Sequence, residues 1–246
     1  MPSARYILVF GAEWLAFAAF VVAESWPPSR SQACNLVWPG LVLLLVGVAC
    51  VAGSESGIRK PLTVWMACLV GAALAGVDHV LKLLSSRALP IGAELQLVPG
   101  HLHFRHTQNE VGSWFLLKLG ISAFAKCAVG ALAALAMVAA WVVYRNYSRK
   151  HHRRGYWPGL AVTLWTGGML SHVVDVALRG AVVDFIGIPG IATVDLKDVF
   201  LTIGAACVFV EVWDNRGSGR RRWPIPTDSV NHISVDRSDP HHGEIA

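Results

Sequence analysis

The sequence predicts an all-α integral membrane protein whose six transmembrane helices carry a small β-structure outside the bilayer. Of its 246 residues, 54% are hydrophobic and only 15% are charged, against about 25% charged residues in soluble globular domains. The mean hydropathy of +0.49 agrees with this class. The basic residues behind the formal net charge of +5 cluster in loops, which is typical of membrane orientation signals. A nucleic-acid partner is therefore not expected.

Six apolar runs are long enough to cross the bilayer as helices, which takes roughly 20 residues each. The runs lie near residues 5–24, 36–53, 61–84, 120–143, 158–178 and 197–213. The first is interpreted as an uncleaved span and not as a signal peptide, because further apolar spans follow it. Residues 1–55 are thus expected to form an N-terminal transmembrane hairpin and residues 56–213 a core. Residues 214–246 are rich in Arg, Ser, Asp, Pro and His, which predicts a disordered cytoplasmic tail.

The positions of the basic residues predict how these helices are oriented. Arg59 and Lys60 lie between the second and third runs, basic residues crowd the segment 145–154, and four arginines lie within residues 216–222. The positive-inside rule makes these three segments cytoplasmic. Six crossings then place both termini in the cytoplasm.

Residues 85–111 fall on the opposite, extracytoplasmic side of the predicted bundle. Apolar residues alternate with other residues there, namely Leu95, Leu97, Leu102 and Phe104. A period of two residues indicates short strands, here near the membrane surface.

The same segment contains His101, His103 and His106. Because alternate residues of a strand share a face, two of these histidines are candidate metal ligands. Zinc needs three or four ligands in fixed geometry, and nothing in the sequence provides that geometry. We therefore predict polar residues of a hydrated surface, with no metal and no cofactor.

Acidic residues at the ends of three runs provide the main functional signal. Asp78 lies in the last turns of the third run, Asp175 closes the fifth and Asp198 opens the sixth. The predicted topology brings all three to the same outer depth of the membrane. Charged groups at that depth are costly unless paired or hydrated, and they mark functional sites. Asp175 and Asp198 are thus candidates for a pair of carboxyl groups that share one proton, while Lys82 lies four residues after Asp78 on the same helix face.

Four sequence motifs surround these acids in a fixed order. Residues 78–82 read Asp-His-Val-Leu-Lys, residues 167–175 read Gly-Gly-Met-Leu-Ser-His-Val-Val-Asp, residues 180–186 read Gly-Ala-Val-Val-Asp-Phe-Ile, and residues 194–200 read Val-Asp-Leu-Lys-Asp-Val-Phe. These motifs resemble the D-x-x-x-K, G-G-A-x-G-N-x-x-D-R, G-x-V-V-D-F-I and F-N-x-A-D-x-x blocks of the bacterial lipoprotein signal peptidase, or signal peptidase II, family. The resemblance covers about residues 60–213.

The resemblance implies a four-helix core with a small extracytoplasmic β-cradle, and an aspartyl endopeptidase that removes signal peptides from lipid-modified prolipoproteins. It places Asp175 and Asp198 on the two catalytic aspartates of the family. It also implies a multi-pass monomer in the bacterial inner membrane, in contact with membrane lipids, with the active site at the extracytoplasmic face. Substrate-binding or supporting roles fall on Asp78, Lys82, Asn109, Glu110, His172, Asp184 and Asp195.

The chain departs from the family pattern at several positions around the motifs. His172 replaces Asn, Val176 replaces Arg, Asp195 replaces Asn and Lys197 replaces Ala. These departures leave open a non-catalytic or repurposed relative that binds lipopeptides or partner membrane proteins. A third hypothesis, a proton-coupled carrier, lacks the repeated halves expected of such proteins.

Overall fold

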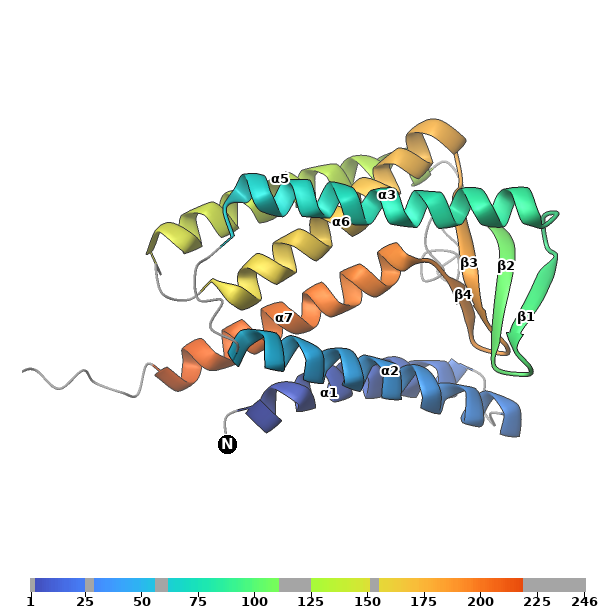
Figure 1. Cartoon of the computed structure of the whole chain (residues 1–246), viewed down its shortest axis with the longest axis horizontal. Helices are drawn as coiled ribbons and strands as arrows, with labels where there is room; N and C mark the ends of the chain where they lie inside the picture. The colour runs from blue at the N-terminus through green and yellow to red at the C-terminus, as the bar shows by residue number, and fades with distance from the viewer. Residues whose placement is uncertain (1–2, 25–28, 56–61, 111–124, 151–154, 219–246) are drawn as a thin grey trace, which may run out of the picture.

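The computed structural model describes residues 3–24, 29–55, 62–110, 125–150 and 155–218. The helices are α1 (Ser3–Glu24), α2 (Arg30–Glu55), α3 (Val64–Ala88), α5 (Ala125–Lys150), α6 (Tyr156–Arg179) and α7 (Leu196–Ser218). The strands are β1 (Glu94–Val98), β2 (Leu102–Asn109), β3 (Val182–Ile188) and β4 (Ala192–Val194). Long helices thus dominate, with a small sheet at one end of the bundle (Figure 1).

Five of these helices, α1, α2, α3, α5 and α6, are long and apolar enough to cross a membrane. The sixth, α7, has 23 residues but carries Lys197 and Asp198 at its start and Glu211 and Asp214 near its end, so composition alone does not mark it as a span. α2 begins six residues before the predicted run and α5 continues seven residues beyond its predicted end. Residues 219–246 of the expected tail lie outside the described residues.

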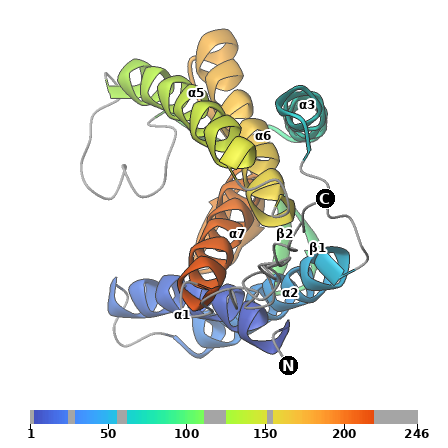
Figure 2. The ribbon, with the colours of Figure 1, turned by 90° about the vertical axis from the view of Figure 1, so that its left-hand side faces the viewer.

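The helix α6 is the centre of the arrangement, since it packs against α3, α5 and α7. The helices α1 and α2 pack on each other as an antiparallel hairpin, and α1 contacts α7. Figure 2 shows α7 lying between this hairpin and α6. α7 therefore connects the N-terminal hairpin to the remaining helices.

An apolar core joins the hairpin to α6 and α7. It contains Phe10 of α1, Leu43 of α2, Trp157 of α6 and Val210 of α7, all buried. A buried aliphatic side chain contributes about 1.5–3 kcal/mol relative to an exposed one. Apolar packing thus holds the hairpin to α6 and α7 through residues 6–14 of α1 and 43–51 of α2.

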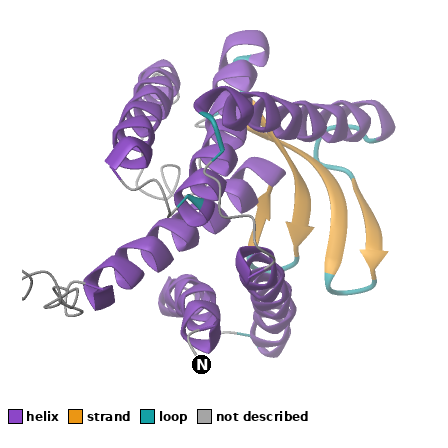
Figure 3. Ribbon diagram, turned by 60° about the vertical axis from the view of Figure 1, so that its left-hand side comes forward, coloured by secondary structure: helices purple, strands orange, loops and turns teal. Residues whose placement is uncertain are grey.

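The four strands form one antiparallel sheet in the order β1-β2-β3-β4 (Figure 3). Strands in residues 85–111 were expected, but β3 and β4 come from the connection between α6 and α7, where the sequence analysis placed none. Gly180 ends α6 in the left-handed conformation at φ 65°, which glycine adopts without steric penalty. Val182, Val183, Phe185 and Ile186 are β-branched or aromatic and favour a strand, so the chain passes directly from helix into sheet.

Two adjacent glycines allow α6 to approach both of its neighbours closely. A Cβ at Gly167 would lie 3.0 Å from Leu74 Cβ of α3, and one at Gly168 would lie 3.0 Å from the Lys197 carbonyl oxygen of α7. The backbones of α3, α6 and α7 therefore converge at this level. The polar residues of the next α6 turn lie at that junction.

Candidate active site

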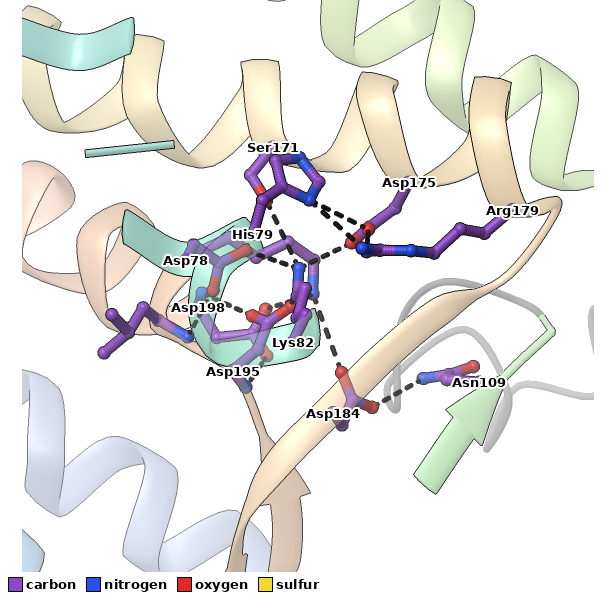
Figure 4. Close-up of polar contacts among 12 residues, drawn as sticks. Asp78, His79, Lys82, Asn109, Ser171, Asp175, Arg179, Asp184, Asp195 and Asp198 are labelled. Carbon is purple, nitrogen blue, oxygen red and sulfur yellow. Dashed lines mark hydrogen bonds and ion pairs between the residues drawn. The ribbon is translucent and has the colours of Figure 1, made fainter. Parts of the chain in front are cut away.

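Lys82 is the centre of a buried ionic cluster. Its Nζ lies 2.5 Å from Asp78 Oδ2, 2.5 Å from Asp175 Oδ2 and 2.7 Å from Asp195 Oδ2. All four side chains are fully buried, and they come from α3, α6 and the residue before α7 (Figure 4). The predicted Asp78–Lys82 pair is confirmed, but it is part of a larger network that ties three segments together.

Hydrogen bonds complete the partners of Asp78. Ser171 of α6 donates from Oγ to Asp78 Oδ2 at 2.5 Å, and the Leu196 backbone N–H at the start of α7 donates to Asp78 Oδ1 at 3.1 Å. Buried carboxylates are stable only when paired and hydrogen-bonded in this way. Ser171, which replaces a glycine of the family pattern, is thus a member of the network.

Asp175 is held by two cations. Lys82 takes one carboxylate oxygen, and Arg179, one turn later on α6, donates from Nη1 to the other at 2.6 Å. His79 Nδ1 lies 3.5 Å from the same oxygen. Arg179 was not among the predicted site residues. It gives Asp175 a cationic partner, although Val176 stands where the family pattern has an arginine. Its i,i+4 spacing from Asp175 is the sequence signal that identifies it.

The start of α7 is a reciprocal cap formed by two aspartates. The Asp198 backbone N–H donates to Asp195 Oδ1 at 3.2 Å, and the Asp195 N–H contacts Asp198 Oδ2 at 3.5 Å. An acceptor at the N-cap and another three residues later satisfy the free N–H groups of a first helical turn. Asp195 therefore caps α7 and also binds Lys82.

A second group of carboxylates lies beside the first. Asp184 of β3, Asp195 and Asp198 each place an oxygen within 4.8 Å of the others. Lys197 Nζ lies among them, 2.8 Å from Asp195 Oδ2, 3.4 Å from Asp198 Oδ1 and 3.8 Å from Asp184 Oδ1. Asn109 of β2 contacts Asp184 Oδ2 through Nδ2 at 3.4 Å. The strand β3 thus delivers an acid to the start of α7.

The three acids of this second group differ in electrostatic environment. Burial raises the pKa of Asp184 from 3.8 to about 7, against an opposing effect of Lys197. Burial also acts on Asp195, but Lys197 and Lys82 outweigh it and hold the pKa of this carboxyl below its usual value. Burial also raises the pKa of Asp198, against an opposing effect of Lys197, although its side chain is 43% exposed. The group thus combines a carboxyl that titrates near neutral pH, a carboxylate held ionised by two lysines, and a partly exposed carboxyl beside Lys197.

The structure does not bring Asp175 and Asp198 together as the topology suggested. Asp175 pairs with Lys82 and Arg179, whereas Asp198 pairs with Lys197. Only Asp195 belongs to both carboxylate groups. Helix ends alone do not determine which acids meet, because β3 places Asp184, and not Asp175, beside Asp198.

The other predicted residues lie at the edges of these groups. Asn109 reaches Asp184, whereas Glu110 is exposed at the end of β2. His172 is buried on α6, and within the described part of the chain nothing pairs with its Nε2.

The three candidate histidine ligands have separate partners. His101 Nδ1 lies 2.6 Å from Asn35 Oδ1, His103 Nδ1 lies 3.1 Å from a Glu94 oxygen, and His106 Nδ1 lies 2.8 Å from the Leu89 carbonyl. Among the described residues, the groups with metal-like spacing consist of aspartates only. Each of these groups surrounds a lysine ammonium, so the positive charge that they need comes from the chain itself.

Comparison with known proteins gives a consistent result. The family described as Signal peptidase (SPase) II matches residues 70–214. A lipoprotein signal peptidase of Parasynechococcus marenigrum is 26% identical over 146 residues, covering 58% of this chain and 86% of that protein. A lipoprotein signal peptidase of Enterococcus faecalis is 24% identical over 147 residues, covering 58% and 84%. A solved bacterial membrane enzyme superposes with a TM-score of 0.54 at 19% identity, covering 68% of this chain and 98% of that one.

Proposed function

The chain belongs to the signal peptidase II family as a divergent member, and on that premise we propose that it is a membrane aspartyl endopeptidase that removes signal peptides from lipid-modified prolipoproteins. The residues matched by the family, 70–214, include every member of both carboxylate groups. Its relatives at 24–26% identity are lipoprotein signal peptidases. The apolar helices support a membrane location, where a lipid-modified substrate would be found.

The catalytic pair that the geometry supports is Asp184 with Asp198. The observation that carries this assignment is the placement of their carboxyl oxygens, with one of Asp195, within 4.8 Å of one another. Aspartyl hydrolysis needs one carboxyl group protonated and the other ionised. Asp184, with a pKa raised to about 7 by burial, suits the protonated role. Asp198, which is more exposed and lies 3.4 Å from the Lys197 ammonium, suits the ionised one.

In the proposed reaction, Asp198 accepts a proton from a water molecule that attacks the scissile carbonyl carbon. Asp184 donates a hydrogen bond to the carbonyl oxygen and stabilises the negative charge that develops there. Collapse of the tetrahedral intermediate breaks the C–N bond, and the proton held by Asp198 passes to the leaving amine.

Asp175 has a structural role in this proposal. Its carboxylate is fully buried and is neutralised by Lys82 and Arg179. Both of its oxygens are engaged by these two cations, so Asp175 is poorly placed to act on a substrate. The Lys82 cluster instead holds α3, α6 and the start of α7 in position.

The test is cleavage of a lipidated prolipoprotein by purified enzyme in liposomes, with three matched Asp→Asn variants. Asp184→Asn and Asp198→Asn are each expected to lower kcat by about 10²–10⁴-fold. Asp175→Asn is expected to lower thermal stability, with turnover per folded molecule largely retained.

A different result would support Asp175 and Asp198 as the catalytic pair, as the sequence predicted. In that case the Asp175→Asn protein would be folded but inactive, and the Asp184→Asn protein would be active. Lipopeptide binding by the wild-type chain without any product would contradict the enzymatic proposal itself.

A further inference from the structure

The first turns of α2 contact the tips of both β-hairpins of the sheet. Asn35 is 1% exposed, and its Nδ2 donates to the Gly100 carbonyl at 3.2 Å and to the Pro189 carbonyl at 3.0 Å. Its Oδ1 lies 2.6 Å from His101 Nδ1. Since an amide oxygen only accepts, His101 carries the hydrogen in this contact. One buried side chain thus joins the β1–β2 turn to the β3–β4 turn.

A second residue of α2 strengthens the contact with the β3–β4 turn. Gln32 Nε2 donates to the Gly190 carbonyl at 2.7 Å. Gly100 and Gly190 both have φ of 75°, a left-handed conformation that turns require and that glycine adopts readily. The backbone carbonyls that receive these hydrogen bonds are therefore in tight turns, and a bond to each turn fixes the end of two strands.

The same hairpin packs on α7 through residues 6–14 of α1 and 43–51 of α2. Phe10 and Leu43 pack in one core with Ile203 and Val210 of α7, and Tyr6 Oη donates to Asp214 Oδ1 at 3.0 Å. The hairpin is therefore in contact with the helix that begins with Asp198 and with the tip of the strand that carries Asp184. These are the two elements whose spacing sets the distance between the proposed catalytic carboxyl groups.

We propose that the α1–α2 hairpin is an internal brace that holds β3 in position relative to α7, and that Asn35 is a positioning residue for the Asp184–Asp198 pair. This inference rests on the proposed function for its catalytic consequence. The family match begins at residue 70, so the brace lies outside the matched segment and is a feature of this chain's own N-terminal part.

The test compares Asn35→Leu and Asn35→Asp with wild-type protein, all full length and in liposomes. Leucine removes all three polar contacts, whereas aspartate keeps an acceptor for His101 and loses both donated bonds. Cys34→Ser, at the exposed neighbouring residue, is the matched control. Amide hydrogen exchange and steady-state cleavage are measured on each.

In both Asn35 variants, the amide hydrogens of the turns 99–101 and 189–191 are expected to exchange faster than in wild type. Those of α6 and α7 are expected to exchange at the wild-type rate. Their kcat/KM is expected to fall by roughly 10- to 100-fold, mainly through kcat, because a displaced catalytic group slows chemistry more than binding. The Cys34→Ser protein should match wild type in both measurements.

Unchanged exchange in the two turns would overturn the brace, and so would wild-type kcat/KM in a variant whose turns exchange faster. Faster amide hydrogen exchange throughout the molecule would also contradict the proposal, because Asn35 would then contribute to global stability and not to the position of the turns. The exchange measurement needs no turnover. An inactive wild-type chain whose Asn35→Leu variant loosens only the turns would thus disprove the proposed function and leave the brace intact.

Discussion

Asp195 connects the two ionic groups of the site. One of its oxygens lies 2.7 Å from Lys82 Nζ and 2.8 Å from Lys197 Nζ, so a structural lysine and a lysine beside the proposed catalytic pair share one carboxylate. At such distances in a buried region, a change of charge on one lysine changes the electrostatic energy of the other. A substitution that removes the charge of Lys82 is therefore expected to alter reactivity as well as stability, because Lys82 shares Asp195 with Lys197.

The first prediction concerns the pH dependence of cleavage. Asp184 must be protonated in the proposed reaction, and its pKa is raised to about 7 by burial. The activity should therefore fall as the pH rises through about 7, and it should fall at low pH as Asp198 becomes protonated. The measurement is kcat/KM for prolipoprotein cleavage as a function of pH, and a rate that stays constant from pH 6 to 9, roughly the range around that pKa, would contradict the assignment.

The same group predicts a pH dependence of stability. The folded protein binds a proton at Asp184 more tightly than the unfolded chain, whose carboxyl has its ordinary pKa of 3.8. The resulting stabilisation is complete at low pH, and it is lost as the pH rises through about 7. The Tm of the wild-type protein in detergent should decline over this interval more than that of Asp184→Asn, and parallel curves would contradict the prediction.

Lys197 provides a further test, because its charge lowers the pKa of Asp184 against the effect of burial. Lys197→Ala, which restores the residue of the family pattern, should therefore move the alkaline limb of the activity profile to higher pH. Lys197→Arg keeps the charge and serves as the control. A limb that moves to lower pH, or that moves equally in both variants, would show that Lys197 does not act on the proton of Asp184.

The sequence predicted which residue types gather at the site better than it predicted which of them pair. Asp78, Lys82, Asp175 and Asp195 were all named, and all lie in one cluster. The pairing depends on angstrom-scale positions that topology does not determine.

Arg179 was missed because a basic residue at the end of a span is also an ordinary interfacial anchor. Asp184 was expected to have a supporting role because the resemblance places it next to the catalytic residues, and the strand that carries it was not predicted.

At the scale of elements, the contact between α3 and α6 depends on Gly71. A Cβ there would lie 2.9 Å from the Thr163 carbonyl oxygen and 2.7 Å from Thr166 Cβ, so Gly71→Ala must push the two helices apart. We expect a loss of about 1–3 kcal/mol, as for other overpacked contacts, measured as a lower Tm in detergent. Gly76→Ala, on the same helix with no atom within 4 Å, should have no such effect. Equal Tm values for the two variants would contradict this account of the packing.

The apolar runs predicted the helices well, because hydropathy over a span-length window is a strong signal. The helix ends were predicted less accurately. The helix α5 runs seven residues further than its apolar run, to Lys150, because Arg145, Arg149 and Lys150 continue it. The strands β3 and β4 were missed for a different reason. They are short, and β3 is buried along most of its length, so it shows no alternation of apolar and polar residues.

At the scale of the whole molecule, the orientation in the membrane is testable through Cys34. It is exposed near the start of α2, at the end of the bundle where the sheet lies (Figure 1). If this end is extracytoplasmic, a membrane-impermeant maleimide should label Cys34 on intact cells, and Cys34→Ser should abolish that labelling. If Cys34 is labelled only after the cells are permeabilised, this end of the bundle is cytoplasmic and the predicted topology is wrong.

The pairing of β2 with β3 has a consequence for how the protein is made. These neighbouring strands, Leu102–Asn109 and Val182–Ile188, are separated in the chain by α5 and α6. During synthesis the β2 edge of the β1–β2 hairpin therefore stays unpaired until α5 and α6 have been inserted and β3 has been made. Asp184 and Asp198 also emerge late, so the proposed catalytic pair cannot form in a nascent chain until insertion is nearly complete.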